Sequence, residues 1–479
     1  MMRQNQQMVL NLGAGARGEA SSAAPQGSEI GAAKACLEPP AALRPSMESV
    51  VERNNLRRAL EQVQRNKGAP GVDGMTVDKL APYLKEHWPA IRAQLLEGNY
   101  KPAPVRRVEI PKATGGTRAL GIPTVLDRFI QQAVMQVLQA AWDPTFSEAS
   151  FGFRPGRSAH QAVARAQTLI ASGHGIVVDL DLEKFFDRVN HDILMGLVAK
   201  RVTDKRILKL IRGFLTAGVL IDGLVGPTEQ GTPQGGPLSP LLSNVMLDVL
   251  DKELEKRGHC FVRYADDCNI YVRSQRAGER VMASIEQFLA RRLKLTVNKA
   301  KSAVAAPQTR KFLGFSFTTG STIKRRLAPQ TVVRCKARVR ELTRRTRGRS
   351  LAQIIEELAR YLTGWRAYFG FCETPSALRA LDQWTRRRLR AIAWKQWKHG
   401  PARFAELTRR GVDQVLAAQT AGSPHGVWRI SHSPALALAF TNRSFVALGL
   451  PSLAPANPSN LPNRRVRTRM PGGVGGAAP

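Results

Sequence analysis

The chain has 479 residues, enough for several domains with cores of their own, and its 72 Lys and Arg against 37 Asp and Glu give a formal net charge of +35. Such an excess of positive charge favours a polyanionic partner, with nucleic acid as the first candidate, because neutralised phosphates release condensed counterions. The five scattered cysteines contain no C-x-x-C pair, which argues against a zinc module or a disulfide framework and suits a reducing cytoplasm.

Both ends of the chain have compositions typical of disorder. Residues 1–45 are rich in Gly, Ala, Ser and Pro, and residues 454–479 are rich in Pro, Gly and Arg, in both cases without hydrophobic periodicity. Such segments cannot bury enough apolar surface to fold, so we expect a disordered N-terminal extension and a disordered tail. A basic chain can also bind anionic membranes, but no apolar run approaches the roughly 20 residues that span a bilayer.

The first ordered part is predicted to form two helices and then a hairpin. Hydrophobic periodicity predicts helices over residues 50–63 and 77–96. Two runs rich in β-formers, residues 105–111 and 117–122, predict the hairpin. Lys112 and Arg118 lie near its turn, where both cations could contact a triphosphate. An ordinary solvated basic hairpin is the alternative.

Residues 151–158 (FGFRPGRS) form a predicted loop that carries two guanidinium groups and two aromatic rings. This mixture can grip a nucleic-acid backbone, and packing of Arg on Phe is an equally good structural account. Ser158 is predicted to cap a helix that runs to residue 170.

Two groups of carboxylates are candidates for a metal site. Asp179 and Asp181 are two residues apart in a predicted strand and therefore point to the same face. Asp266 and Asp267 fall at the tip of a predicted hairpin between two β-rich runs. Neighbouring carboxylates repel each other, and Mg²⁺, which prefers oxygen ligands, relieves that repulsion. Two other interpretations stay open, since Asp is a common turn residue and strand acids often pair with surface Lys or Arg.

Residues 231–240 (GTPQGGPLSP) form a Gly- and Pro-rich loop that is predicted to open a helix. Ser239 suits the N-cap of this helix and Pro240 its first position. The glycines allow a substrate to approach the backbone closely, and Gln234 could then reach it with an amide. A structural turn before a core helix is the alternative.

The C-terminal part combines basic residues with helical periodicity. Residues 324–349 contain eleven Lys or Arg and a single acid, and helical spacing follows as far as residue 397. We expect Trp384, Trp394 and Trp397 to be core residues rather than base-stacking platforms. The basic side chains are too dense for a merely solvated face and are expected to bind nucleic acid.

Four of these stretches occur in an order and spacing that match a known family. They are DLEKFFD at 181–187, GTPQGGPLSP at 231–240, YADD at 264–267 and LTGWRAYF at 362–369. On these motifs the chain resembles the group II intron-encoded reverse transcriptase and maturase family across about residues 47–453.

The resemblance implies an α+β fold, that of a right-hand polymerase followed by an α-helical thumb/maturase domain. The fingers and palm are expected over residues 46–325, the thumb/maturase domain over 326–408 and a basic DNA-binding segment over 409–453. Some family members end in a Cys- and His-bearing endonuclease module. Because no cysteine follows Cys372, we do not expect this chain to cut the second target strand itself.

The resemblance also implies roles for individual residues. Asp181, Asp266 and Asp267 match the ligands of two Mg²⁺ ions, with Asp179 as the runner-up for Asp181. Phe186 matches the gate that excludes a ribose 2′-hydroxyl. The remaining implied positions are Lys112, Arg118 and Gln234 for nucleotide contacts, Lys301 as the acid for pyrophosphate departure, and Phe312, Leu313, Gly314 and Phe315 as the primer grip.

The implied activity is that of an RNA-directed DNA polymerase, a nucleotidyltransferase that also binds group II intron RNA and assists its splicing and retrohoming. Its partners would be the intron RNA, a DNA target or primer and dNTPs, in the bacterial cytoplasm, with the oligomeric state open. Two alternatives remain: a maturase that assists splicing without polymerising, and a retron- or defence-type reverse transcriptase.

Overall fold

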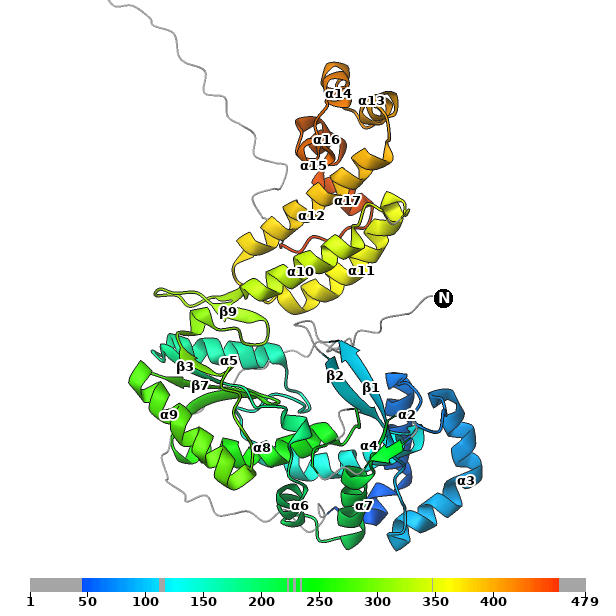
Figure 1. Cartoon of the computed structure of the whole chain (residues 1–479), viewed down its shortest axis with the longest axis vertical. Coiled ribbons are helices and arrows are strands. Elements are labelled where there is room, and N and C mark those ends of the chain that lie inside the picture. Colours follow the sequence, from blue (N-terminus) through cyan, green and yellow to red (C-terminus); the bar gives the residue numbers. More distant parts are fainter. Residues whose placement is uncertain are drawn as a thin grey trace, which may run out of the picture. The chain divides into compact units, whose positions relative to one another are not determined.

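The computed structural model describes residues 45–111, 117–221, 224–226, 230–232, 235–346 and 348–455 (Figure 1). Its α-helices are α1 (Met47–Val50), α2 (Arg53–Asn66), α3 (Val77–Glu97), α4 (Val125–Trp142), α5 (Ala159–Ala171), α6 (His191–Ala199), α7 (Lys205–Thr216), α8 (Ser239–Lys256), α9 (Gln275–Phe288), α10 (Pro329–Leu342), α11 (Leu351–Phe369), α12 (Pro375–Gln396), α13 (Gly400–Arg409), α14 (Gln414–Ala421), α15 (Val427–Ile430), α16 (Pro434–Ala439) and α17 (Asn442–Ala447). Its strands are β1 (Val105–Pro111), β2 (Thr117–Ile122), β3 (Ile176–Leu180), β4 (Val219–Ile221), β5 (Leu224–Gly226), β6 (Cys260–Tyr264), β7 (Asp267–Val272), β8 (Ala303–Ala305), β9 (Phe315–Phe317) and β10 (Arg325–Leu327). The expected disordered segments, 1–45 and 454–479, lie almost wholly outside the described residues.

A four-stranded antiparallel sheet, in the order β6-β7-β3-β8, forms the central sheet. Its strands are rich in β-branched and aromatic residues, and successive side chains point to opposite faces. Val178 and Ile270 belong to a core that includes α8 and α9, whereas Val177 and Tyr271 belong to a second core with α5 and the C-terminal helices. The central sheet is therefore covered on both faces.

A second sheet has the strand order β2-β1-β4-β5. The predicted hairpin of β1 and β2 is confirmed, with paired residues running from Arg106 opposite Ile122 to Pro111 opposite Thr117. Helix α4 follows directly, because the Thr124 hydroxyl accepts a hydrogen bond from the Asp127 amide and caps its first turn.

Helices α10, α11 and α12 pack against one another, and the short helices α13 to α17 follow them (Figure 1). Trp394 on α12 is only 1% exposed, which confirms its prediction as a core residue. Trp384 is half-buried instead, and Lys336, Arg340 and Arg388 lie 5.7, 5.5 and 5.4 Å from its ring centroid. This part of the chain is therefore helical, as predicted, with cations gathered around an aromatic side chain.

Two predicted helix boundaries are wrong. The helix expected over residues 50–63 is broken between α1 and α2, because Glu52 is extended and its carboxylate accepts hydrogen bonds from the first amides of α2. Ser239 is not an N-cap. The preceding residue, Leu238, already has helical dihedral angles, and its buried side chain anchors that start of α8 in the core, so Ser239 and Pro240 occupy the first two helical positions.

Within the described part of the chain, every helix is too short or too polar to cross a bilayer.

Candidate active site

The register of β3 and β7 brings Asp181 and Asp267 together. Leu180 at the end of β3 lies opposite Cys268 of β7. Asp181 is the next residue after Leu180, and Asp267 is the residue just before Cys268, so the two acids are neighbours at the same end of the antiparallel pair.

A two-residue turn places Asp266 at that same end. Tyr264 of β6 pairs with Asp267 of β7, which leaves Ala265 and Asp266 as the connection between the strands. Ala265 has a φ of 57°, in the left-handed region that residues other than Gly seldom adopt. A strained turn of this kind persists only where surrounding contacts hold it.

Arg263 supplies much of that support. It is buried in β6, one residue before Tyr264, and its guanidinium donates to the Asp251 carboxylate of α8. The same group donates to Asn244 Oδ1 at 3.0 Å and to the Ala265 carbonyl at 2.9 Å. Sequence reasoning missed this role, although a charged residue inside an apolar strand is a signal that could have revealed it.

The loop at 151–158 packs directly against the acidic turn. The Gly152 carbonyl accepts a hydrogen bond from Asn244 Nδ2 at 2.9 Å, and a Cβ at Gly152 would lie 2.2 Å from the Ala265 amide nitrogen. Only glycine therefore allows the loop to approach the turn this closely.

The arginines of that loop bind the protein itself. Arg154 is buried, its Nε donates to Asp143 at 2.9 Å, and its Nη1 donates to the carbonyls of Ser147 and Ser150. Arg157 lies 5.6 Å from the Phe151 ring centroid. Of the two interpretations that the sequence left open, the structural one accounts for both guanidinium groups.

Charge repulsion is the main electrostatic property of the site. Asp267 lies at the strand end, where part of the residue is accessible to solvent. Its carboxyl is surrounded by protein, and this burial, together with the nearby charges of Asp266, Asp179 and Asp181, raises its pKa to about 7. Repulsion of this kind is relieved when a cation binds between the carboxylates.

Asp179 and Asp181 have different basic partners. Arg310 holds Asp179, with its Nη2 atom 2.7 Å from Oδ2, although burial still raises the pKa of the Asp179 carboxyl. Asp181 has Lys301 as its neighbour, with Nζ 3.6 Å from Oδ1. Asp179 forms the closer ion pair, at 2.7 Å against 3.6 Å, which favours Asp181 as the acid that acts at the sheet end.

The acids fit Mg²⁺ by the chemistry of their donors. They supply only oxygen atoms, from two adjacent residues and one cross-strand neighbour, and they repel one another. Among the described residues, however, no three His, Cys, Asp or Glu side chains converge closely enough to form a ready metal cage. The three acids therefore lie at the same end of the sheet, but their side chains are not arranged as a closed metal site.

Phe186 lies in a short 3₁₀ helix, Phe185–Asp187, that follows β3 and Asp181. Its side chain is 9% exposed and packs edge-on against Phe185, with ring centroids 5.2 Å apart. The Phe186 carbonyl accepts a hydrogen bond from the Thr232 amide at 2.7 Å. The start of the Gly- and Pro-rich loop therefore lies against the predicted sugar gate.

The side chains of three residues predicted to contact the nucleotide lie outside the described part of the structure. Lys112 and Gln234 lie outside the described residues. The backbone of Arg118 is in β2, opposite Ile110, and its side chain is likewise outside the described part.

The four residues predicted as the primer grip form a tight turn that leads into β9. Phe312 and Phe315 exchange two backbone hydrogen bonds of 2.9 Å, and both side chains are buried. Leu313 and Gly314 lie at its tip.

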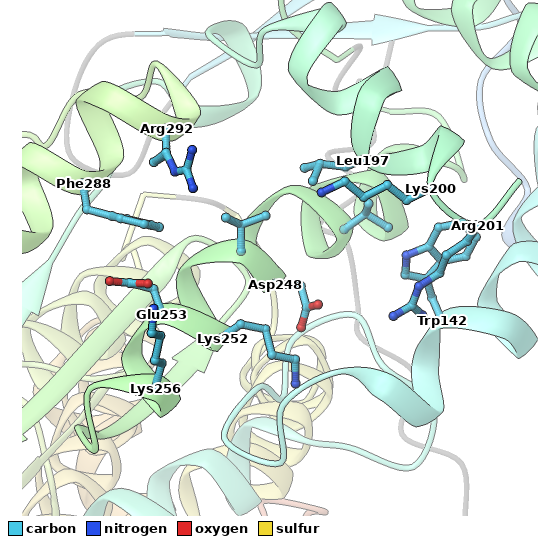
Figure 2. Close-up of a pocket in the computed structure, with 12 residues that line it drawn as sticks. Trp142, Leu197, Lys200, Arg201, Asp248, Lys252, Glu253, Lys256, Phe288 and Arg292 are labelled. Carbon is cyan, nitrogen blue, oxygen red and sulfur yellow. The ribbon is translucent and has the colours of Figure 1, made fainter. Parts of the chain in front are cut away.

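A pocket of about 360 Å³ lies elsewhere, on helices α4, α6, α8 and α9 (Figure 2). Figure 2 shows that its labelled side chains are mostly basic or aromatic: Trp142, Leu197, Lys200, Arg201, Asp248, Lys252, Glu253, Lys256, Phe288 and Arg292. None of the predicted site residues is among them, so this pocket is separate from the acidic edge.

Two family models match successive parts of the chain. Residues 110–317 match the model described as reverse transcriptase (RNA-dependent DNA polymerase), and residues 332–411 match the group II intron, maturase-specific domain. The first range contains the central sheet and all the predicted acids. The fold and these matches define a reverse transcriptase domain followed by a maturase domain.

Individual relatives agree with this domain pair. "Protein YkfC" of Escherichia coli (strain K12) is 36% identical over 229 residues, which cover 47% of this chain and 60% of that protein. The "Group II intron-encoded protein LtrA" of Lactococcus lactis subsp. cremoris is 38% identical over 195 residues, covering 40% of this chain and 32% of that protein. The chain is thus similar to a group II intron-encoded protein in sequence and carries both domain matches, but it spans less than two thirds of the length of either relative.

A solved structure, titled "Partial Cas6-RT-Cas1--Cas2 complex", is also similar, with 25% sequence identity and a TM-score of 0.34. The match covers 51% of this chain and 42% of that chain.

Proposed function

We propose that the chain is an RNA-directed DNA polymerase that binds a group II intron RNA, assists its splicing and copies it during retrohoming. The observation that carries the proposal is the position of Asp181 beside the Asp266 and Asp267 turn, at an exposed end of the central sheet. Three mutually repelling carboxylates destabilise the folded protein. A metal-dependent polymerase site accounts for their arrangement, whereas a protein that only binds RNA does not need it.

In this proposal Asp181, Asp266 and Asp267 hold two Mg²⁺ ions. When bound, these ions lower the pKa of the primer 3′-hydroxyl and neutralise charge on the leaving pyrophosphate. The carboxylates orient the reactants and restrict water by occupying the edge of the site. Asp179 keeps Arg310 in place and is not a ligand.

Other residues act on the nucleotide and the primer. The Phe186 ring limits the space at the sugar, so that a 2′-hydroxyl is rejected by contact. Lys301 carries a proton at Nζ, 3.6 Å from Asp181, and donates it toward the leaving pyrophosphate. The turn at 312–315 holds the primer end, and Lys112, Arg118 and Gln234 contact the incoming nucleotide.

The helices α10 to α12 supply the RNA-binding part of the proposal. The maturase-specific match supports it, and so do the cations around Trp384. Phosphate contacts by such a surface depend on salt and are largely independent of sequence. The bacterial relatives support a bacterial cytoplasm as the location, and dNTPs and a DNA primer are the proposed substrates.

Primer extension tests the polymerase proposal. Purified protein with Mg²⁺, a homopolymeric RNA template and a complementary DNA primer is expected to incorporate dNTPs, and Asp266→Ala is expected to abolish incorporation while RNA binding in a filter assay persists. Asp192→Ala, which removes an exposed acid paired with Arg212 on other helices, serves as the matched control. Undiminished synthesis by Asp266→Ala would remove the assigned role.

The same assay separates the alternatives. A maturase that only assists splicing would bind RNA and fail to extend a primer in the wild-type form. A retron- or defence-type enzyme would extend primers, but the DNA flanking its gene would not encode a self-splicing ribozyme. The maturase-specific match at residues 332–411 favours the intron-encoded function.

A further inference from the structure

The turn at residues 312–315 has a conformation that its sequence does not favour. Leu313 has a φ of 50° and Gly314 a φ of 86°, so both central residues of this two-residue turn are left-handed. This is the pattern of a type I′ turn, for which Asn-Gly is the preferred pair. Glycine suits the second position, but leucine at the first is strained, and the turn therefore requires outside support.

That support comes from the C-terminal helices. The Tyr368 hydroxyl, at the end of α11, donates to the Leu313 carbonyl at 3.0 Å. The Thr331 hydroxyl of α10 donates to the Gly314 carbonyl at 2.8 Å. A Cβ at Gly314 would lie only 2.8 Å from the Phe369 ring, so the ring packs directly on the turn backbone. Both central carbonyls of the turn are thus held by side chains from beyond residue 328.

The Tyr368 ring also packs against two neighbouring aromatic side chains. Its ring centroid is 5.1 Å from that of His160 on α5 and 5.8 Å from that of Phe315. Burial, and secondarily the nearby Tyr264, raise the pKa of the Tyr368 hydroxyl to about 12, so it remains a hydrogen-bond donor at neutral pH. Tyr264 directly precedes the acidic turn, so the Tyr368 hydroxyl that binds the Leu313 carbonyl is also near the strand that leads into that turn.

We propose that Tyr368 is a positioning residue of the polymerase, whose hydroxyl holds the Leu313-Gly314 turn in the left-handed conformation that places a primer end before Asp266 and Asp267. The proposal rests on the proposed polymerase function and gives the LTGWRAYF tract a role within it. Through Tyr368 and Phe369, the α-helical C-terminal region determines where the primer lies. Tyr368 itself touches neither the nucleotide nor the reacting atoms.

The first test removes only the hydroxyl. Tyr368→Phe is expected to raise the KM for a DNA primer annealed to a homopolymeric RNA template about 3- to 10-fold, the effect of one lost hydrogen bond, with kcat changed less than about 2-fold. Tyr361→Phe is the matched control, because Tyr361 lies on the same helix and its hydroxyl is hydrogen-bonded to Cys335 rather than to the turn. Equal KM values for the two variants would overturn the proposal.

A double-mutant cycle tests the mechanism. Asn adopts left-handed dihedral angles more readily than Leu, so Leu313→Asn makes the turn less dependent on outside support. Tyr368→Phe is therefore expected to raise KM by less in the Leu313→Asn background than in the wild type. The same rise in both backgrounds would mean that the hydroxyl does not act through the turn. Failure of the proposed function is distinguishable, since the wild-type protein itself would then extend no primer.

Discussion

Arg263 and Asp251 form an ion pair in which both side chains are completely buried, with exposed fractions of 0%. The Arg263 Nε atom donates to Asp251 Oδ1 at 2.7 Å, and Nη2 donates to the other carboxylate oxygen, so the pair is bidentate. Because Arg263 also holds the Ala265 carbonyl, one guanidinium group connects helix α8 to the turn that carries Asp266.

Arg263→Met is expected to lower the free energy of unfolding by about 3 to 5 kcal/mol, because it leaves the Asp251 carboxylate buried without its partner. Thermal unfolding followed by circular dichroism measures the loss. Arg257→Met, which breaks a partly exposed pair with Glu253 at the end of α8, is the control and is expected to cost about 1 kcal/mol or less. Similar losses for the two variants would contradict the importance given to the buried pair.

Asp181→Asn and Asp179→Asn distinguish the two strand acids. If Asp181 is the Mg²⁺ ligand, Asp181→Asn is expected to reduce kcat by at least about 100-fold, since one ligand oxygen loses its charge. Asp179→Asn is expected to reduce it far less, because Asp179 is paired with Arg310. Single-turnover primer extension over a range of Mg²⁺ concentrations measures both effects. A larger defect in Asp179→Asn would reverse the assignment.

Phe186→Val is expected to admit ribonucleotides, because a smaller side chain leaves room for the 2′-hydroxyl. The measurement is the ratio of kcat/KM for a dNTP and the matching rNTP, which we expect to fall by about 10-fold or more, the effect of relieving one steric contact. Phe185→Leu changes the neighbouring ring, which packs against Phe186 in the core, and serves as the control. An unchanged ratio in Phe186→Val would count against the gate.

Asp248 predicts a pH dependence of stability. Burial and the charge of Asp251 raise the pKa of the Asp248 carboxyl from 3.8 to about 6. Because the folded state then binds the proton more tightly than the unfolded state, this group makes the protein less stable as pH rises from about 4 to about 6. Asp248→Asn removes that loss and is expected to raise the free energy of unfolding by about 1 to 2 kcal/mol at pH 8 and little at pH 3.5. Thermal unfolding at both pH values measures this as a change in Tm. An equal change in Tm at both pH values would exclude the raised pKa as the cause.

Local sequence signals predicted much of the fold. Runs rich in β-formers placed β1 and β2 correctly, and helical spacing found the helices α3, α5 and α12 to within a few residues. These features depend on periodicity and capping residues that lie close together in the chain. The break between α1 and α2 was missed because Glu52 replaces the usual capping residues, and the start of α8 was misplaced because burial of Leu238 outweighed the capping preference of Ser239.

For the site, the residue types and their spacing singled out the acids as candidate metal ligands, whereas the sugar gate and the primer grip were implied by the family resemblance; all of these roles stay predictions. Only the tertiary structure decided which groups meet: the register that puts Asp181 beside Asp267, the pairing of Asp179 with Arg310, and the support of Leu313 by Tyr368. The reason is physical. Strand register, ion-pair partners and packing between helices are contacts between distant parts of the chain, and they form only when the two cores bring those parts together.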